Sequence, residues 1–161
     1  VIDLAIGSTI LRSPPVQQPN LFSLPSLMPD YAANEALRQG EVGQDVFRAG
    51  LMDYWDGRCA VTGLAVPELL RASHIKPWAD CETDAERLDV FNGFLLAPHL
   101  DASFDGGLIT VDEVGVVRAS GRLSVHARAV LGLVDGLAIR SLSGRHAGYL
   151  RWHREHVFRT N

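Results

Sequence analysis

The sequence predicts an α+β domain in which short strands and short helices follow one another within one compact unit. A helical pattern over residues 41–56 is followed by short apolar runs at 58–63, 69–75 and 94–96, which have the length of strands. Further along, Pro98 and the pair Gly106-Gly107 lie at the two ends of a segment that has the length of a short helix. These patterns indicate two strands, a loop and a short helix, with flanking helices and an additional β-hairpin.

The composition fits one domain with an appendage. The chain has 161 residues and is 47% hydrophobic, which is enough apolar content to bury a core. The two cysteines, Cys59 and Cys81, form no pair or quartet with zinc-finger spacing, so neither a disulfide framework nor a structural zinc is expected, and a reducing cytoplasm fits. We expect no membrane association, because no apolar run is long enough to cross a bilayer and the amino end lacks signal-peptide features.

The first 40 residues differ in pattern from the rest. Residues 13–29 hold five of the eight prolines and show no sustained hydrophobic period, as is typical of an extended linker or a strap across a domain. Because the chain also begins with valine, we expect it to be a piece of a longer protein. Residues 1–40 are then a linker, a strap or the end of a preceding domain, and residues 41–161 form the compact unit.

The helix predicted over residues 41–56 has one apolar face and ends at the sequence DGR. The residues on that face are Val46, Phe47, Gly50, Leu51, Tyr54 and Trp55. Strand-like segments follow at 58–63 and 69–75, and a polar stretch after them contains a short helix over residues 84–88. The first helix is therefore expected to face the core.

The second half begins with an extended segment, FLL, and then a helix that starts at Pro98 and ends near Asp105. Residues 108–120 alternate like a hairpin around the turn sequence DEVG. Residues 145–158 predict a basic, aromatic helix.

The net charge of −4 conceals an uneven distribution. Residues 1–117 carry 7 Lys+Arg against 17 Asp+Glu, whereas residues 118–161 carry 8 against 2, so the two parts have charges of −10 and +6. The acidic part argues against binding of polyanions by broad charge alone, but a local basic face can still meet phosphates while acidic residues elsewhere hold a cation. Charge by itself does not identify the partner.

A histidine at the end of a predicted strand, followed by a carboxylate-bearing helix, indicates a hydrolytic metal site. His74 can take a proton from water near neutral pH. Asp101 and Asp105 are four residues apart on the predicted helix, so both carboxylates face one side, where they can bind a hard cation such as Mg²⁺ or Mn²⁺. His99 can add a nitrogen ligand, and the Asn92 amide can orient the imidazole or fix the loop.

Each of these residues also has a purely structural interpretation. His74 alone suits a hydrogen-bonded strand histidine, and Asn92-Gly93 alone suits an ordinary turn. Asp101 can simply be an acidic residue that the dipole of the helix favours near its start. Asp105 can be a helix cap or a solvated residue, and His99 can be a surface residue. The functional hypothesis depends on their joint order, with the histidine first, the asparagine second and the acid pair last.

The run YWDGRCAVTG, then LLRASHIKPW, then DVFNGFLLAPHLDASFDGGLIT resembles an HNH endonuclease domain of the subgroup found among restriction endonucleases. The resemblance is close over about residues 44–120. It implies a ββα-metal fold, in which two strands and a helix grip one divalent ion. It also implies that His74 is the general base, Asn92 the central asparagine, Asp101 the counterpart of the last histidine of the motif, and Asp105 a second helix ligand.

Two departures from the family pattern affect the metal shell. Many relatives carry Asp or His before the base, where this chain has Ser73, and the cysteine pairs that bind zinc in other branches are absent. The resemblance therefore implies a carboxylate-dominated shell that favours Mg²⁺ or Mn²⁺ over Zn²⁺. Whether His99 binds metal, supports a ligand or does neither stays open.

The implied activity is one-metal hydrolysis of DNA phosphodiester bonds by the cleavage module of a restriction or defence system. An attached or separate recognition domain is expected to choose the target, and a homodimer stays open. Phosphate contacts are assigned to Lys76, Arg71, Arg151 and Arg154, although a solvated lysine and a packed terminal helix explain the same residues. Two alternatives stay open: a nucleic-acid-binding module with an HNH fold and no catalysis, and a metal-dependent hydrolase of another substrate.

Overall fold

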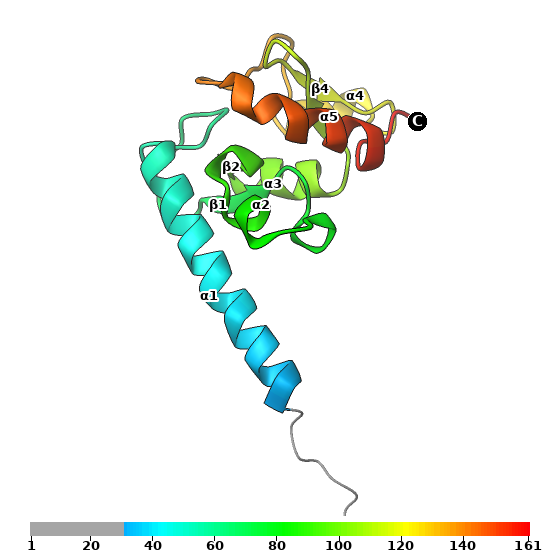
Figure 1. Cartoon of the computed structure of the whole chain (residues 1–161). Coiled ribbons are helices and arrows are strands. Elements are labelled where there is room, and N and C mark those ends of the chain that lie inside the picture. Colours follow the sequence, from blue (N-terminus) through cyan, green and yellow to red (C-terminus); the bar gives the residue numbers. More distant parts are fainter. Residues whose placement is uncertain (1–30) are drawn as a thin grey trace, which may run out of the picture.

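The computed structural model describes the backbone of residues 31–161 and the side chains of residues 40–161 (Figure 1). The proline-rich stretch at 13–29 lies outside the described residues. In chain order the elements are α1 (Tyr31–Tyr54), β1 (Arg71–His74), η2 (Trp78–Asp80), α2 (Asp84–Leu88), η3 (Val90–Asn92), β2 (Gly93–Leu96), α3 (Pro98–Asp105), β3 (Ile109–Val111), β4 (Val117–Ala119), α4 (Val125–Val130), η4 (Gly144–His146) and α5 (Ala147–His156). The predicted α+β class is confirmed.

Two short strands and one helix form the centre of the fold. β1 and β2 pair antiparallel, with Arg71 opposite Leu96 and His74 opposite Gly93. α3 follows β2 directly and packs against β1. The predicted arrangement of two strands, a loop and a short helix is therefore present.

Sequence signals at both ends explain why α3 is so short. Pro98 occupies the first turn, where its missing N–H costs no hydrogen bond. Gly106 caps the carboxyl end, and Gly107 follows with φ of +67°, a conformation that favours glycine. Leu100 and Phe104 are buried, which leaves the acidic positions of the helix on a different face. The predicted bounds of this helix are confirmed.

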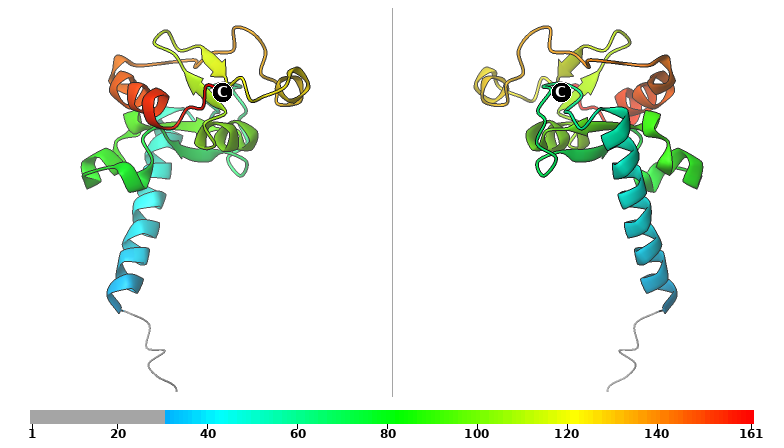
Figure 2. Two further views of the ribbon diagram at one scale, coloured as in Figure 1. Left: turned by 90° about the vertical axis from the view of Figure 1, so that its right-hand side faces the viewer. Right: turned by 90° about the vertical axis from the view of Figure 1, so that its left-hand side faces the viewer.

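α1 begins at Tyr31, so the prediction that residues 31–40 belong to an extended linker is wrong. The segment ANEALRQ, residues 33–39, consists mainly of good helix formers, which favour continuing the helix upstream. Figure 1 and Figure 2 show the first turns of α1 projecting away from the rest of the described chain. Its carboxyl-terminal part contributes Phe47, Leu51 and Trp55 to the core.

The prediction of a strand at residues 58–63 is also wrong, because this segment is a series of turns. Gly57 and Gly63 have positive φ angles of 60° and 74°, which a regular strand does not tolerate. The Cys59 Sγ accepts hydrogen bonds from the backbone N–H groups of Thr62 (3.4 Å) and Ala97 (3.3 Å). These bonds fix the turn against the start of α3 without a strand ladder.

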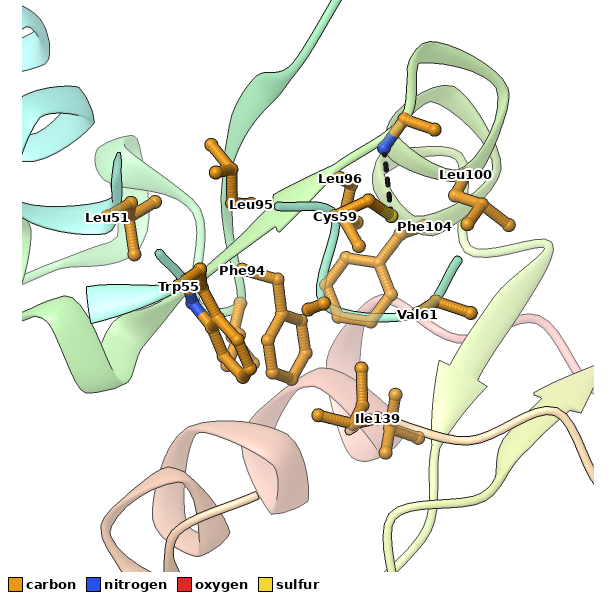
Figure 3. Close-up of a cluster of buried hydrophobic side chains, with 14 of the residues drawn as sticks. Leu51, Trp55, Cys59, Val61, Phe94, Leu95, Leu96, Leu100, Phe104 and Ile139 are labelled. Carbon is orange, nitrogen blue, oxygen red and sulfur yellow. Dashed lines mark hydrogen bonds between the residues drawn. The ribbon is translucent and has the colours of Figure 1, made fainter. Parts of the chain in front are cut away.

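One hydrophobic core connects the central unit to the flanking elements (Figure 3). It includes Leu51 and Trp55 from α1, Phe94, Leu95 and Leu96 from β2, Leu100 and Phe104 from α3, Ile139 from the loop after α4, and Leu150 from α5. The ββα unit therefore shares its core with both long flanking helices.

The predicted hairpin and terminal helix are confirmed as β3–β4 and α5. α5 lies against β3, where the Thr110 hydroxyl is 2.9 Å from Nδ1 of the buried His153. α4 was not predicted; its main local signal is the Ser124 side chain, which accepts a hydrogen bond from the Ala127 N–H. Among the residues that the structure describes, no helix has the length and hydrophobicity needed to span a bilayer.

Candidate active site

His74, the last residue of β1, is held by the loop that connects the two central strands. Its Nε2 lies 2.8 Å from the backbone carbonyl oxygen of Arg87. Because a carbonyl can only accept, this bond assigns the proton of the neutral ring to Nε2. The lone pair of Nδ1 is then the basic site of the imidazole.

Aromatic rings surround the His74 imidazole. The Phe47 ring stacks on it with centroids 3.7 Å apart and planes 15° apart, and the Trp78 ring lies nearly perpendicular to it with centroids 5.6 Å apart. Burial lowers the pKa of His74 below its usual 6.5, and the hydrogen bond to the Arg87 carbonyl counters part of that effect. The neutral form, which a general base requires, is therefore favoured at pH 7.

Asn92 is fully buried and fixes the same loop. Its side-chain oxygen accepts from the Lys76 N–H at 2.8 Å. Its amide nitrogen lies within hydrogen-bond distance of the carbonyl oxygens of Lys76 and Glu86, both at 3.1 Å, and of the Cys81 Sγ at 3.3 Å. The structure therefore places Asn92 as the anchor of the loop that carries the Arg87 carbonyl, and not in direct hydrogen bonding with His74.

Asp101, which is half-buried, and Asp105, which is exposed, lie on the same face of α3. Burial raises the pKa of both carboxyl groups above the usual 3.8, and the negative charge of Asp101 raises the pKa of Asp105 further. The nearby Ser73 hydroxyl counters the pKa increase for both acids, as the Arg71 guanidinium does for Asp101. Two carboxylates on one face of a helix, each with a raised pKa, favour the binding of a cation.

Ser73 lies beside this acid pair with only 1% of its surface exposed. Its Oγ is buried and has no hydrogen-bond partner of normal geometry in the described structure. A buried hydroxyl without a partner costs about 1–3 kcal/mol, so a ligand at this position would relieve the cost.

A cleft of about 420 Å³ brings these groups together. Ser73, His74 and Asp105 line it, together with Gln44 and Trp78. His153 of α5 and Val157, the residue that follows α5, also line the cleft. His74 and Asp105 therefore line the same cleft, and Asp101 lies one helical turn before Asp105.

The donor set suits a hard cation. Within residues 40–161 no group of three or more His, Cys, Asp and Glu side chains is placed to hold a metal by itself. The available donors are the carboxylates of Asp101 and Asp105 and the hydroxyl of Ser73, all of them oxygens, and Mg²⁺ commonly keeps several water ligands besides such groups. The unpartnered Ser73 oxygen is the observation that makes the site fit a metal ion.

His99 is not brought into the cleft. It is exposed at the start of α3, and Asp101 is two positions further along, which is about 200° around the helix axis. The backbone carbonyl of His99 accepts a hydrogen bond from the Ser103 hydroxyl at 2.6 Å. The structure therefore places its ring away from the acid pair.

The residues predicted to contact nucleic acid fall into two groups. Lys76 is only 11% exposed and pairs with Glu86 at 3.2 Å, and Arg154 bonds to the Val111 carbonyl and to Glu113. Arg71 and Arg151 are exposed. Only the second pair is free to meet phosphates without breaking an ion pair of the described structure.

Three contributors to the site were not predicted from the sequence. Phe47 is expected from the sequence only in the core, although its ring stacks on the His74 imidazole. The Arg87 carbonyl and the cleft-lining Gln44 carried no recognisable signal, because a backbone oxygen has no sequence motif and an exposed glutamine is common on helices.

Comparison with known proteins tests the family. No curated protein matches the chain. Residues 59–112 match the family model described as HNH endonuclease, a segment that contains His74, Asn92 and both acids of α3. The match agrees with the ββα arrangement and with the order of these residues along the chain. Over residues 59–112 the chain is therefore similar to the HNH endonuclease family.

Proposed function

We propose that the protein is a metal-dependent endonuclease that hydrolyses DNA phosphodiester bonds, with His74 as the general base. The observation that carries this proposal is the shared cleft, which His74, Ser73 and Asp105 line together. We further propose that it acts as the cleavage module of a restriction or defence system, with an attached or separate domain to choose the target.

The base acts through Nδ1, because Nε2 donates to the Arg87 carbonyl. Nδ1 takes the proton of a water molecule that attacks the scissile phosphorus, and the carbonyl stabilises the positive charge that develops on the ring. Burial keeps the His74 pKa below 6.5, so the ring is neutral and ready to accept that proton at pH 7.

Asp101, Asp105 and Ser73 would hold one Mg²⁺ or Mn²⁺ ion. When bound, such an ion supplies positive charge to the phosphate oxygens and to the leaving oxygen. Arg71, exposed on β1, and Arg151, exposed on α5, bind phosphates farther along the DNA. Asn92 keeps the loop, and with it the Arg87 carbonyl, in place.

Plasmid nicking tests this function most directly. The purified chain is incubated with supercoiled DNA in Mg²⁺, Mn²⁺, Zn²⁺ or EDTA, with His74→Ala as the matched control. We expect nicking in Mg²⁺ or Mn²⁺, no nicking in EDTA, and none from the variant. Equal nicking by parent and variant would assign the activity to a contaminant or to another base.

The second candidate function is a nucleic-acid-binding module without catalysis. It is favoured by Ser73, which stands where many relatives carry a charged metal ligand. DNA binding that persists in every metal condition, with no nicking in any of them, would support this candidate over the first.

A further inference from the structure

We propose that α1, which lies outside the segment matched to the family, forms one wall of the active site, with Phe47 as the residue that positions His74. This inference rests on the proposed function, because the position of the imidazole matters for catalysis only if His74 is the base.

The contact between the two rings is the first support. Phe47 is fully buried, and its ring lies nearly parallel to the imidazole, with centroids 3.7 Å apart. Stacking fixes the plane of the imidazole, whereas the 2.8 Å bond to the Arg87 carbonyl fixes its rotation within that plane. Together the two contacts determine the direction of the Nδ1 lone pair.

A glycine opposite His74 makes room for Phe47. Gly93 is the cross-strand partner of His74, and a Cβ at this position would lie 2.4 Å from Cζ of Phe47 and 3.0 Å from Leu51. The backbone of Gly93 is extended, with φ of −156°, so its conformation does not require glycine. The space occupied by Phe47 is therefore the reason for glycine at this position.

A second glycine on α1 accommodates the other ring that touches the base. Gly43 lies one helical turn before Phe47, and a Cβ there would be 2.5 Å from Cη2 of Trp78, whose ring lies nearly perpendicular to that of His74. Glycine inside a helix costs about 1 kcal/mol relative to alanine. The close packing of Trp78 against α1 explains why the helix carries glycine at this position despite the cost. Both rings that neighbour His74 therefore depend on α1: Phe47 belongs to it, and Trp78 packs against it at Gly43.

Phe47→Leu is the main test, since leucine keeps an apolar side chain but has no flat face. We expect kcat for nicking to fall roughly ten- to hundredfold while KM for DNA changes much less, because the variant alters the base and not the DNA contacts. Phe47→Tyr, which keeps the ring, should retain most of the activity if the added hydroxyl is accommodated. Val46→Ala is the control, because Val46 neighbours Phe47 but is 53% exposed.

A measurement on the metal-free protein tests the positioning without any activity. Nitrogen-15 NMR of the imidazole at pH 8, where His74 is neutral, reports which ring nitrogen carries the proton. The parent should show the Nε2–H form, with ring protons shifted by the Phe47 ring current. Phe47→Leu should lose that shift and show a mixture of the two tautomers.

Gly43→Ala keeps the inference testable if Phe47→Leu fails to fold. Alanine favours the helix, so a drop in kcat would come from displacement of Trp78 and not from unfolding. Unchanged kcat and an unchanged imidazole spectrum in the folded variants would overturn the inference. If the parent nicks no DNA in any metal, the proposed function fails, and the spectrum alone decides whether Phe47 orients His74.

Discussion

The side-chain amide of Asn92 lies 3.1 Å from the carbonyl oxygen of Glu86, one residue before the carbonyl that holds His74. Asn92 and His74 thus bind the same loop, and a single buried side chain secures the backbone on which the orientation of the imidazole depends. The same loop is held on its outer side by the Lys76–Glu86 ion pair.

Asn92→Ala should therefore reduce both stability and activity. The substitution removes the hydrogen bonds to Lys76 and Glu86 and leaves buried backbone groups without partners, at a cost of roughly 2–4 kcal/mol. Urea unfolding measures the stability, and plasmid nicking at a temperature where the variant is folded measures the activity. Loss of activity with unchanged stability would instead assign Asn92 a direct catalytic role.

His74→Ala should separate activity from folding. We expect nicking to fall by a factor of roughly 10²–10⁴, which is the usual contribution of a general base. Circular dichroism and Mn²⁺ titration should show the parent's fold and nearly its metal affinity, since His74 is not among the oxygen donors. Turnover close to that of the parent would reject His74 as the base.

Asp101→Asn and Asp105→Asn should weaken metal binding without destabilising the metal-free protein. Each folded-state pKa lies above 3.8, so the stability contribution of these groups is largest in acid and is lost as the pH rises through the raised pKa. Replacing a charged carboxylate with a neutral amide therefore removes this destabilisation at pH 7. In thermal unfolding, Mn²⁺ at 100 times Kd should stabilise the parent by about 2.7 kcal/mol and each variant by less.

The exposed His99 offers the matched control for this experiment. His99→Gln should bind Mn²⁺ as the parent does. Equal Mn²⁺ affinity in the parent and both aspartate variants would move the metal ion to another part of the protein.

Arg151→Gln and Arg154→Gln should have different effects, although both arginines were predicted to contact DNA. Arg151 is exposed, so its loss should reduce the dependence of log K on log salt by about 0.9, the value for one phosphate contact. Arg154 bonds to Val111 and Glu113, so its loss should lower the unfolding free energy and leave the salt slope nearly unchanged. Binding isotherms in EDTA at several salt concentrations, with urea unfolding alongside, distinguish the two.

His153 should make the fold sensitive to acid. Burial lowers its pKa from 6.5 to about 4, so its contribution to stability is present above pH 6.5 and is lost as the pH falls to about 4. At about 1.4 kcal/mol per pH unit this difference corresponds to roughly 3 kcal/mol. His153→Gln should flatten the profile of unfolding free energy between pH 7 and 4, and a profile identical to that of the parent would show that His153 does not titrate in this range.

Elements with strong local signals could be predicted from the sequence. Pro98 and Gly106 bound α3, and the DEVG turn places the hairpin, because each signal acts within a few residues. The segment at 58–63 could not be predicted, since it is apolar like a strand but its hydrogen bonds involve the Cys59 sulfur and the distant Ala97. Local sequence signals therefore predict most of the helices and strands. The prediction at residues 58–63 is wrong because a tertiary contact determines the backbone conformation there.

The candidate site shows the same limit. The order of His74, Asn92, Asp101 and Asp105 is visible in the sequence, because a strand end and a helical spacing place them. The ion pair between Arg154 and Glu113 is not visible, since the two residues lie far apart along the chain and meet only when α5 packs on the hairpin. A basic residue in a helix therefore predicts a positive charge, but it does not predict whether that charge is free to bind phosphate or is already paired with an acidic residue.

The core shared between the ββα unit and its flanking helices limits how far the unit can be excised or transplanted. A fragment restricted to residues 59–112 would keep the motif but lose Leu51 and Trp55 on one side and Leu150 on the other. Phe94 and Leu95 would then face water, and apolar strands exposed in this way promote aggregation. The minimal exchangeable cassette is therefore larger than the sequence signature of the family, and a chimaera has to carry both flanking helices with it.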